Sequence, residues 1–427
     1  MMKQLVCILC LGFLALRLPA QQDSVNSKQR LDFAKTYFEV GANYFPSFMG
    51  EGLIDNEISS FEHPASFNSY LNWGGFHFWG HAEFFVSIPL GQYTFQQDEV
   101  IDHKLTHTVA TGLRIFPWIY QEQKLRPYAG ISWAGLDFKQ IIKPAEDQPV
   151  LSKDFLMGLD AGLLYGYRDF AFRLGINYFP QNKWAYPISR SNMTEIHTPS
   201  YSIQLGILYA LDVSRKNDKQ TIDRWNSYPT LSKQNSDAKT LGDFFIGIGP
   251  SSSYSLVKSS FNQEHFPYLK QRLISNPFFE LTGGYHFKKA GLFTALSFRN
   301  PSFETSGFGA KQIIQKTSLA LELNKFLLDY SGFTPYLGLN VAMERMKYTE
   351  EVNELRRELN FDTKANMGIT LGWDIRPGKN EEALILRTNL RWYPFSSFEV
   401  DGSRFNFSQL EYNLIQVILY PGRIRKR

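Results

Sequence analysis

The sequence predicts an all-β protein, a transmembrane antiparallel up-and-down β-barrel made of two repeats of eight strands. Short stretches recur at a spacing of roughly 210 residues, which indicates a duplicated unit. The connections between predicted strands are alternately short and long, and side chains within the strands alternate between apolar and polar. Short turns at one end of a sheet and long loops at the other are typical of outer-membrane barrels.

Five short stretches of the first half return in the same order in the second half. A single match of this length arises by chance, whereas five collinear ones favour duplication. The pairs are GGFHF (Gly74–Phe78) with GGYHF (Gly283–Phe287), PYAGI (from Pro127) with PYLGL (from Pro335), MGLDAG (from Met157) with MGITLG (from Met367), NYFP (from Asn177) with RWYP (from Arg391), and ILY (from Ile207) with ILY (from Ile418).

Composition excludes several classes of protein. Aromatic residues reach 15%, with 36 Phe and 22 Tyr, while the mean hydropathy is −0.27. After the N-terminal segment no stretch approaches the roughly 18 to 20 apolar residues that a membrane helix needs. A net charge of +4 over 427 residues implies no nucleic-acid partner.

The N-terminal residues have the layout of a cleavable export signal. Lys3 precedes an apolar run from Leu5 to Leu16, and Ala20 supplies a small residue at the expected cleavage point. We therefore expect residues 1–20 to be a signal peptide and the mature chain to reach the cell outer membrane. Cys7 and Cys10 are the two cysteines of the chain, so the mature protein would have no disulfide or thiolate chemistry.

The remaining chain divides into β-barrel unit 1 (36–211), a polar periplasmic linker (212–242) and β-barrel unit 2 (243–421). The strands predicted for unit 1 are Thr36–Pro46, Ser66–Phe78, Ala82–Leu90, His103–Ile119, Leu125–Phe138, Asp154–Tyr167, Phe170–Pro180 and Ser200–Leu211. Those of unit 2 are Asp243–Tyr254, Asn276–Lys288, Ala290–Asn300, Ile313–Leu328, Thr334–Tyr348, Lys364–Arg376, Glu382–Pro394 and Ser408–Tyr420.

Alternation within single strands places polar residues on one face. In Phe170–Pro180, Phe172 and Leu174 share one face while Arg173 and Asn177 share the other. The polar face needs an interior and the apolar face needs lipid or a core. Aromatic residues also gather at strand ends, as in Tyr178 and Phe179 before Pro180, where an aromatic girdle would meet the membrane interfaces.

The export signal, the alternating strands and the strand-ending ILY triplets resemble the small outer-membrane β-barrel proteins of Gram-negative bacteria, the OmpX/OmpW-like group. The resemblance covers both halves and rests on pattern. One departure is that Tyr420 is followed by the basic tail PGRIRKR, whereas such chains usually end on an aromatic residue.

The number of barrels stays open at this point. Two closed eight-stranded barrels in tandem and one sixteen-stranded barrel would both leave no unpaired strand edge. The long linker and the ILY that ends each unit favour two barrels.

Histidines and charges on the predicted inner faces are the candidate site residues. His77 and His286 belong to the repeated GGxHF stretch, and His77 faces the lumen if Phe76 and Phe78 face lipid. Buried charges must pair, so the charged residues would form either a salt-bridged plug or the lining of a pore. The lumen-facing candidates are His77, His286, Glu39, Glu83, Arg114, Asp160, Arg173, Glu280, Glu322, Asp374, Arg387 and Arg391.

We expect a non-enzymatic protein that has a structural role or binds a partner through its long outer loops, with no catalytic residue, metal site or cofactor. Its partners would be outer-membrane lipids and a protein or small molecule at these loops, where Glu351–Leu359 could form a short amphipathic helix. A porin-like channel for small solutes is the alternative. An outer-membrane lipid hydrolase, using His197 with Ser200 or His63 with Ser66, is a third hypothesis, although no nucleophile-elbow pattern frames either serine.

Overall fold

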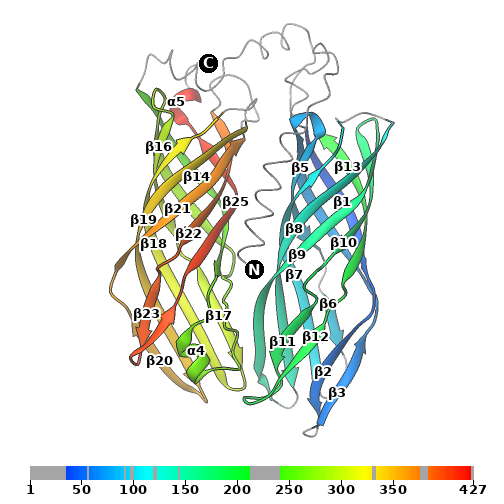
Figure 1. The fold of residues 1–427 in the computed structure, drawn as a ribbon, viewed down its shortest axis with the longest axis vertical. Helices are drawn as coiled ribbons and strands as arrows, with labels where there is room; N and C mark the ends of the chain where they lie inside the picture. The colour runs from blue at the N-terminus through cyan, green and yellow to red at the C-terminus, as the bar shows by residue number, and fades with distance from the viewer. Residues whose placement is uncertain are drawn as a thin grey trace.

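The computed structural model describes residues 35–54, 57–90, 93–96, 101–118, 123–142, 145–211, 241–328, 333–375 and 383–424. The predicted signal peptide and nearly all of the predicted linker lie outside these residues. Strands dominate the described chain, and Figure 1 shows them in two groups that stand side by side with similar orientation. The prediction of an all-β protein is therefore confirmed.

The first group is a closed antiparallel barrel of eight strands, as predicted. Its strands are β1 (Lys35–Phe45), β4 (Ser66–His77), β5 (Ala82–Pro89), β7 (Ile101–Ile115), β8 (Leu125–Ile142), β9 (Ala145–Tyr167), β10 (Phe170–Tyr178) and β13 (Tyr201–Leu211). Each strand pairs with the next in this order, and β13 pairs back to β1, so the ring has no open edge. We refer to it as the first ring.

A second series of antiparallel pairings, the second ring, also returns to its starting strand. Its members are β14 (Gly242–Ser255), β15 (Phe278–Phe287), β16 (Leu292–Arg299), β18 (Ala310–Phe326), β19 (Phe333–Val352), β21 (Lys364–Ile375), β22 (Leu384–Tyr393) and β25 (Gln409–Leu419). Strand β14 pairs with β15 on one side and with β25 on the other. The intervening pairs follow chain order.

The two ends of each ring differ. At one end, the short-turn end, brief connections join the strands, among them the 3₁₀ turn η2 (Phe78–Gly80) and the two residues 168 and 169; the helix α5 (Pro421–Ile424) also lies there. The other end, the long-loop end, carries additional elements. They are β2 (Phe48–Ile54), β3 (Glu57–His63), β6 (Tyr93–Gln96), β11 (Lys183–Pro187), β12 (Met193–His197), α4 (Ser260–His265), β17 (Ser302–Gly307), β20 (Leu355–Asn360), β23 (Ser397–Val400) and β24 (Ser403–Asn406).

These additional elements correct one prediction. The segment Glu351–Leu359 is not a helix, because β19 continues past its turn into β20 as a hairpin. Glu350 lies opposite Arg357 and Glu351 lies opposite Arg356. Opposite charges at facing positions favour a strand pair. The helix prediction considered this segment alone and so did not include its pairing with β19.

Strand alternation sorts side chains between interior and exterior. Tyr128 is buried inside the first ring directly opposite Gly162, and Tyr336 is buried inside the second ring directly opposite Gly372. A Cβ atom added at Gly162 would lie 2.5 Å from the Tyr128 hydroxyl, and one at Gly372 would lie 2.4 Å from the Tyr336 hydroxyl. A glycine is therefore required beneath the side chain of each tyrosine. The matched PYxG and MGxxxG stretches pack against each other in the same way in both halves.

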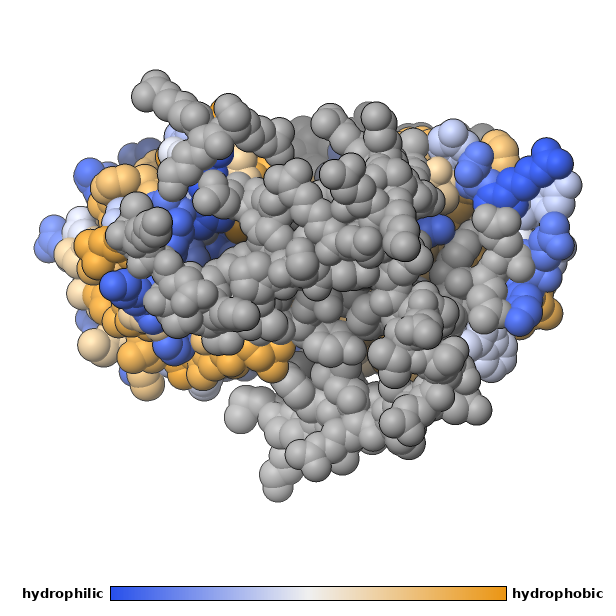
Figure 2. Space-filling view, turned by 90° about the horizontal axis from the view of Figure 1, so that it is seen from above, coloured by the Kyte–Doolittle hydropathy of each residue, from blue (hydrophilic) through white to orange (hydrophobic). Residues whose placement is uncertain are grey.

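The outward faces carry an apolar belt. On β13 the exposed side chains of Leu205 and Ile207 lie between Tyr201 and Tyr209, which are also exposed. These two tyrosines are eight residues apart, or about 26 Å along the strand, and strand tilt shortens the height that they span. Figure 2, which looks from the short-turn end, shows hydrophobic residues around the outside of the second ring, at the left of the view. Among the described residues no helix has the length and apolar character needed to cross a membrane.

Candidate functional site: the barrel interiors and their caps

The interior of the first ring is filled by an ion-paired cluster. Arg114 Nη1 lies 2.9 Å from Glu83 Oε1, and Arg173 Nη2 lies 2.7 Å from the same oxygen. Arg173 Nε also lies 3.0 Å from Glu39 Oε1, while Arg114 Nε lies 3.3 Å from Asp160 Oδ2. Three carboxylates and two guanidinium groups, from β1, β5, β7, β9 and β10, thus form one connected network, the first interior cluster.

Tyrosine and amide side chains complete this network. Tyr70 donates its hydroxyl proton to Glu39 Oε1 at 2.7 Å, and Asn72 donates to Glu39 Oε2 at 3.1 Å. Tyr37 donates to Glu83. All these groups are buried, so the desolvation of the charges is offset by charge-assisted hydrogen bonds rather than by water.

The second ring has an equivalent interior built from different positions. Arg391 makes two parallel hydrogen bonds to Glu280, at 2.7 and 2.8 Å, and its Nε donates to Glu322 at 2.8 Å. Arg387 pairs with both oxygens of Asp374, at 2.7 and 2.8 Å. Such forked pairs fix geometry as well as charge.

Sequence reasoning missed Lys316, Glu344 and Arg299, which lie in a further group closer to the long-loop end of the second ring. Lys316 Nζ lies 2.8 Å from Glu344 Oε1 and 2.6 Å from Glu411 Oε1, and Arg299 also pairs with Glu411. The signal was present in the strand alternation, because Lys316 shares its face of β18 with the predicted interior residue Glu322. Together with Glu280, Glu322 and Arg391, these four residues form the second interior cluster.

Eleven of the predicted lumen residues lie in the ring interiors, and His77 does not. Phe76 lies directly opposite Glu83, so it points inward with that carboxylate, and the next residue, His77, points outward. The His77 ring packs against Phe84 at 5.4 Å between centroids. The eleven are Glu39, Glu83, Arg114, Asp160, Arg173, Glu280, His286, Glu322, Asp374, Arg387 and Arg391.

The repeated histidines are therefore not equivalent. His286 lies opposite the buried Phe293 and points into the second ring, where its ring contacts Phe326 and Tyr420. A shift of one residue in register moves a side chain to the opposite face of a strand. The GGxHF stretches match in sequence but differ by this shift, and so do the ILY triplets, since Ile207 is exposed whereas Ile418 is buried.

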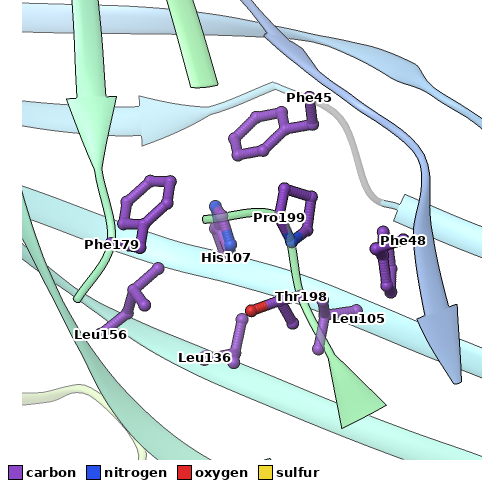
Figure 3. Close-up of a pocket in the computed structure, with 9 residues that line it drawn as sticks. All are labelled: Phe45, Phe48, Leu105, His107, Leu136, Leu156, Phe179, Thr198 and Pro199. Atoms are coloured by element: carbon purple, nitrogen blue, oxygen red, sulfur yellow. The ribbon is translucent and has the colours of Figure 1, made fainter. Parts of the chain in front are cut away.

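Aromatic clusters close both interiors at the long-loop end. In the first ring the rings of Phe45 and Phe179 stack 6.4 Å apart, and His107 meets Phe45 edge-on at 5.4 Å. Figure 3 shows these side chains with Leu156 and Leu136 around a cavity of about 20 Å³. That volume holds roughly one water molecule.

In the second ring the short helix α4 forms the cap. Its residue Phe261 is buried against Tyr348 and Phe405. Asn262 exchanges two hydrogen bonds with Gln312, at 2.9 and 3.0 Å, which tie the helix to β18. Ser259 accepts the Asn262 backbone N–H and so begins the helix.

The histidine and serine pairs considered for a lipid hydrolase have other surroundings. His197 Nε2 lies 3.7 Å from Glu195 Oε2 on strand β12, and both side chains are about half exposed. His63 is buried on β3 with its ring 4.4 Å from that of Phe48. Among the described residues no group of three or more His, Cys, Asp or Glu side chains could hold a metal ion.

Strands β11, β12, β2 and β3 pair in this order as a small sheet at the long-loop end, and His63 is expected to make its stability depend on pH. Burial lowers the pKa of His63 from 6.5 to about 4, so the folded sheet keeps a neutral ring where the unfolded segment takes up a proton. The stability that depends on the neutral ring is complete above pH 6.5 and falls until pH 4. We expect hydrogen exchange in β2 and β3, corrected for its intrinsic pH dependence, to accelerate through this window, and His63→Phe to remove the effect. An unchanged profile in that variant would contradict this assignment.

Comparison with known proteins gives weak likenesses. No family model matches the chain. No curated protein matches it either. Among solved structures, Neisserial surface protein A is 14% identical, with a TM-score of 0.29, over 42% of this chain and 96% of that one. Ail, the attachment invasion locus protein of Yersinia pestis, is 11% identical, with a TM-score of 0.29, over 42% of this chain and 99% of that one. The COG4313 outer membrane channel from Pseudomonas putida F1 is 7% identical, with a TM-score of 0.21, over 93% of this chain and 98% of that one. Likenesses with TM-scores this low carry no inference about this chain.

Proposed function

We propose that this chain is an integral outer-membrane protein in which two plugged eight-stranded barrels, derived from an internal duplication, anchor a surface structure that binds a partner. The observation that carries the proposal is the pairing of buried charges across both interiors, beneath an outer belt of exposed apolar side chains. The protein acts without catalysis or a cofactor.

The apolar belt supports the membrane placement. Leucine and isoleucine side chains such as Leu174, Ile207 and Leu321 are about half exposed or more, in positions that alternate with buried ones. Water would disfavour so large a continuous apolar surface, whereas lipid chains favour it. Closed rings suit a bilayer because they leave no strand edge without hydrogen bonds.

The shared packing of Tyr128 on Gly162 and of Tyr336 on Gly372 supports the duplication. Each tyrosine comes from a PYxG stretch and each glycine ends an MGxxxG stretch, and the two residues face each other in the strand ladder. Two unrelated barrels would have no reason to place the same contact between the same pair of neighbouring strands.

The filled interiors favour a plugged protein over a pore. A water-filled pore keeps its lining charges hydrated, whereas the charges of both interior clusters are nearly inaccessible to solvent and bind one another. The aromatic caps at the long-loop end add a second barrier in each ring. The elaborated long-loop end is then the part that offers a surface to a protein or small-molecule partner.

Planar-bilayer recording tests this proposal. We expect the mature chain, shown to be folded by its heat-modifiable gel mobility, to insert into lipid and to give no conductance steps. Paired charges and close packing inside each ring leave no path for hydrated ions. A porin recorded under the same conditions provides the positive control. Large, stable steps from the folded protein would overturn the plugged reading and favour the channel for small solutes.

A further inference from the structure

The outer faces of the two rings meet along a line of aromatic pairs. Phe78 and Phe333 meet at the short-turn end, with ring centroids 5.3 Å apart. Moving toward the long-loop end, Phe84 packs against Trp373 at 6.1 Å, Trp133 against Tyr412 at 5.9 Å, and Phe155 against Tyr254 at 5.4 Å. We call these four pairs the seam.

Burial distinguishes the seam from the rest of the outer surface. Tyr412 points outward, because its neighbours Glu411 and Asn413 point inward, yet its exposed fraction is 6%. Thr111 also points outward, opposite Trp133, and is 8% exposed. By contrast, Leu321 on a free outer face is 61% exposed. The second ring therefore covers Thr111 of the first ring, and the first ring covers Tyr412 of the second.

The chemistry of the seam suits association within lipid. Lipid chains are as apolar as leucine, so apolar character alone does not bring two membrane segments together; close packing and hydrogen bonds do. The seam offers both, since its edge-to-face and tilted aromatic pairs pack closely and the Tyr412 side chain hydrogen-bonds Thr111.

A set of polar contacts, the clasp, continues the seam at the long-loop end. Leu151 of β9 pairs with Ser306 of β17 across the two rings, and Thr305 donates its hydroxyl proton to the Leu151 carbonyl at 3.3 Å. Arg190 donates to the Phe308 carbonyl at 2.7 Å and to the Asn353 side chain at 2.7 Å. Lys153 with Asn276 and Asp154 with Lys270 complete the clasp.

We propose that the seam and the clasp form a lipid-excluding interface that fixes the two rings as one unit in the membrane. Their long-loop ends then make one composite binding surface, with residues of the clasp at its centre, instead of two surfaces that move independently on a linker. This inference rests on the membrane placement proposed above.

Cysteine cross-linking in the full chain tests the interface, because the native cysteines, Cys7 and Cys10, both fall in the predicted signal peptide. Leu151→Cys with Ser306→Cys probes the clasp, since facing positions of a ladder have Cα atoms about 4.5 to 5.5 Å apart, within reach of a disulfide. Trp133→Cys with Tyr412→Cys probes the middle of the seam with a short bismaleimide. Leu174→Cys with Leu321→Cys, on exposed outer faces, is the matched control. A protease site is added to the linker. After cleavage, the two halves of the chain run separately on a denaturing gel unless a cross-link joins them.

We expect both probe pairs to hold the cleaved halves together, at a yield at least tenfold above the control. Yields no higher than the control, in protein that folds and inserts, would overturn the interface. A cross-link at the clasp without one at Trp133 and Tyr412 would overturn the lipid-excluding seam. Labelling of the control cysteines by a water-soluble maleimide in intact vesicles would instead show that these faces are not in lipid, which removes the membrane placement and the interface with it.

Discussion

Replacing Arg391 with methionine lowers the free energy of unfolding of the protein in lipid vesicles by about 3 to 5 kcal/mol, because the change leaves two buried carboxylates without their cation. Arg391 is 1% exposed and is the partner of both Glu280 and Glu322. Methionine keeps much of the side-chain volume, so the loss reports the charge and not a cavity. Urea titration followed by tryptophan fluorescence and gel mobility measures it.

Two variants define what this result means. Arg356→Met removes an exposed arginine from the hairpin at the long-loop end, where its side chain is 65% exposed, and we expect a change within about 0.5 kcal/mol. Adding Glu280→Gln and Glu322→Gln to Arg391→Met should recover much of the loss, since no unpaired charge remains. If Arg391→Met unfolds at the urea concentration of the parent protein, the second interior cluster is hydrated and the plugged interior is wrong.

Replacing Leu321 with arginine costs about 2 to 4 kcal/mol in vesicles, the penalty for a cation on the lipid face near the bilayer midplane. Leu321 is 61% exposed and lies between Leu296 and Val341 on the apolar belt. Its exposure means that the substitution breaks no internal packing, so the penalty comes from the surroundings of the barrel. The same urea titration measures it.

The matched control is Leu355→Arg, because Leu355 is also an exposed leucine, at 79%, but lies on β20 beyond the apolar belt. We expect this variant to unfold as the parent protein does. Equal effects from the two arginines would mean that the outer faces of the barrel do not contact lipid.

The strands and the interior charges could be read from the sequence because a strand has a period of two. Arg173 alternates with Phe172 and Leu174, so one face of β10 had to be interior, and the structure buries Arg173 there. The same rule, followed along β18 from Glu322, would have found Lys316. The small sheet and the α4 cap could not be found in this way, because their segments are short and are stabilised by packing against the long-loop end of a barrel.

Partners across the interior could not be read from sequence. Arg173 and Glu39 are 134 residues apart and meet because β13, which pairs with both of their strands, brings these strands within reach. The seam was equally hidden, because an outward aromatic residue such as Trp133 has the same pattern whether it meets lipid or another barrel.

The sequence by itself determined that this chain forms alternating strands with polar residues on one face, since that follows from local geometry. Only the tertiary structure decided which face is inward at a strand end, as His77 and His286 demonstrate. The physical reason is that period-two alternation fixes which residues share a face, whereas hydrogen-bond register with the neighbouring strand selects the face that becomes the interior.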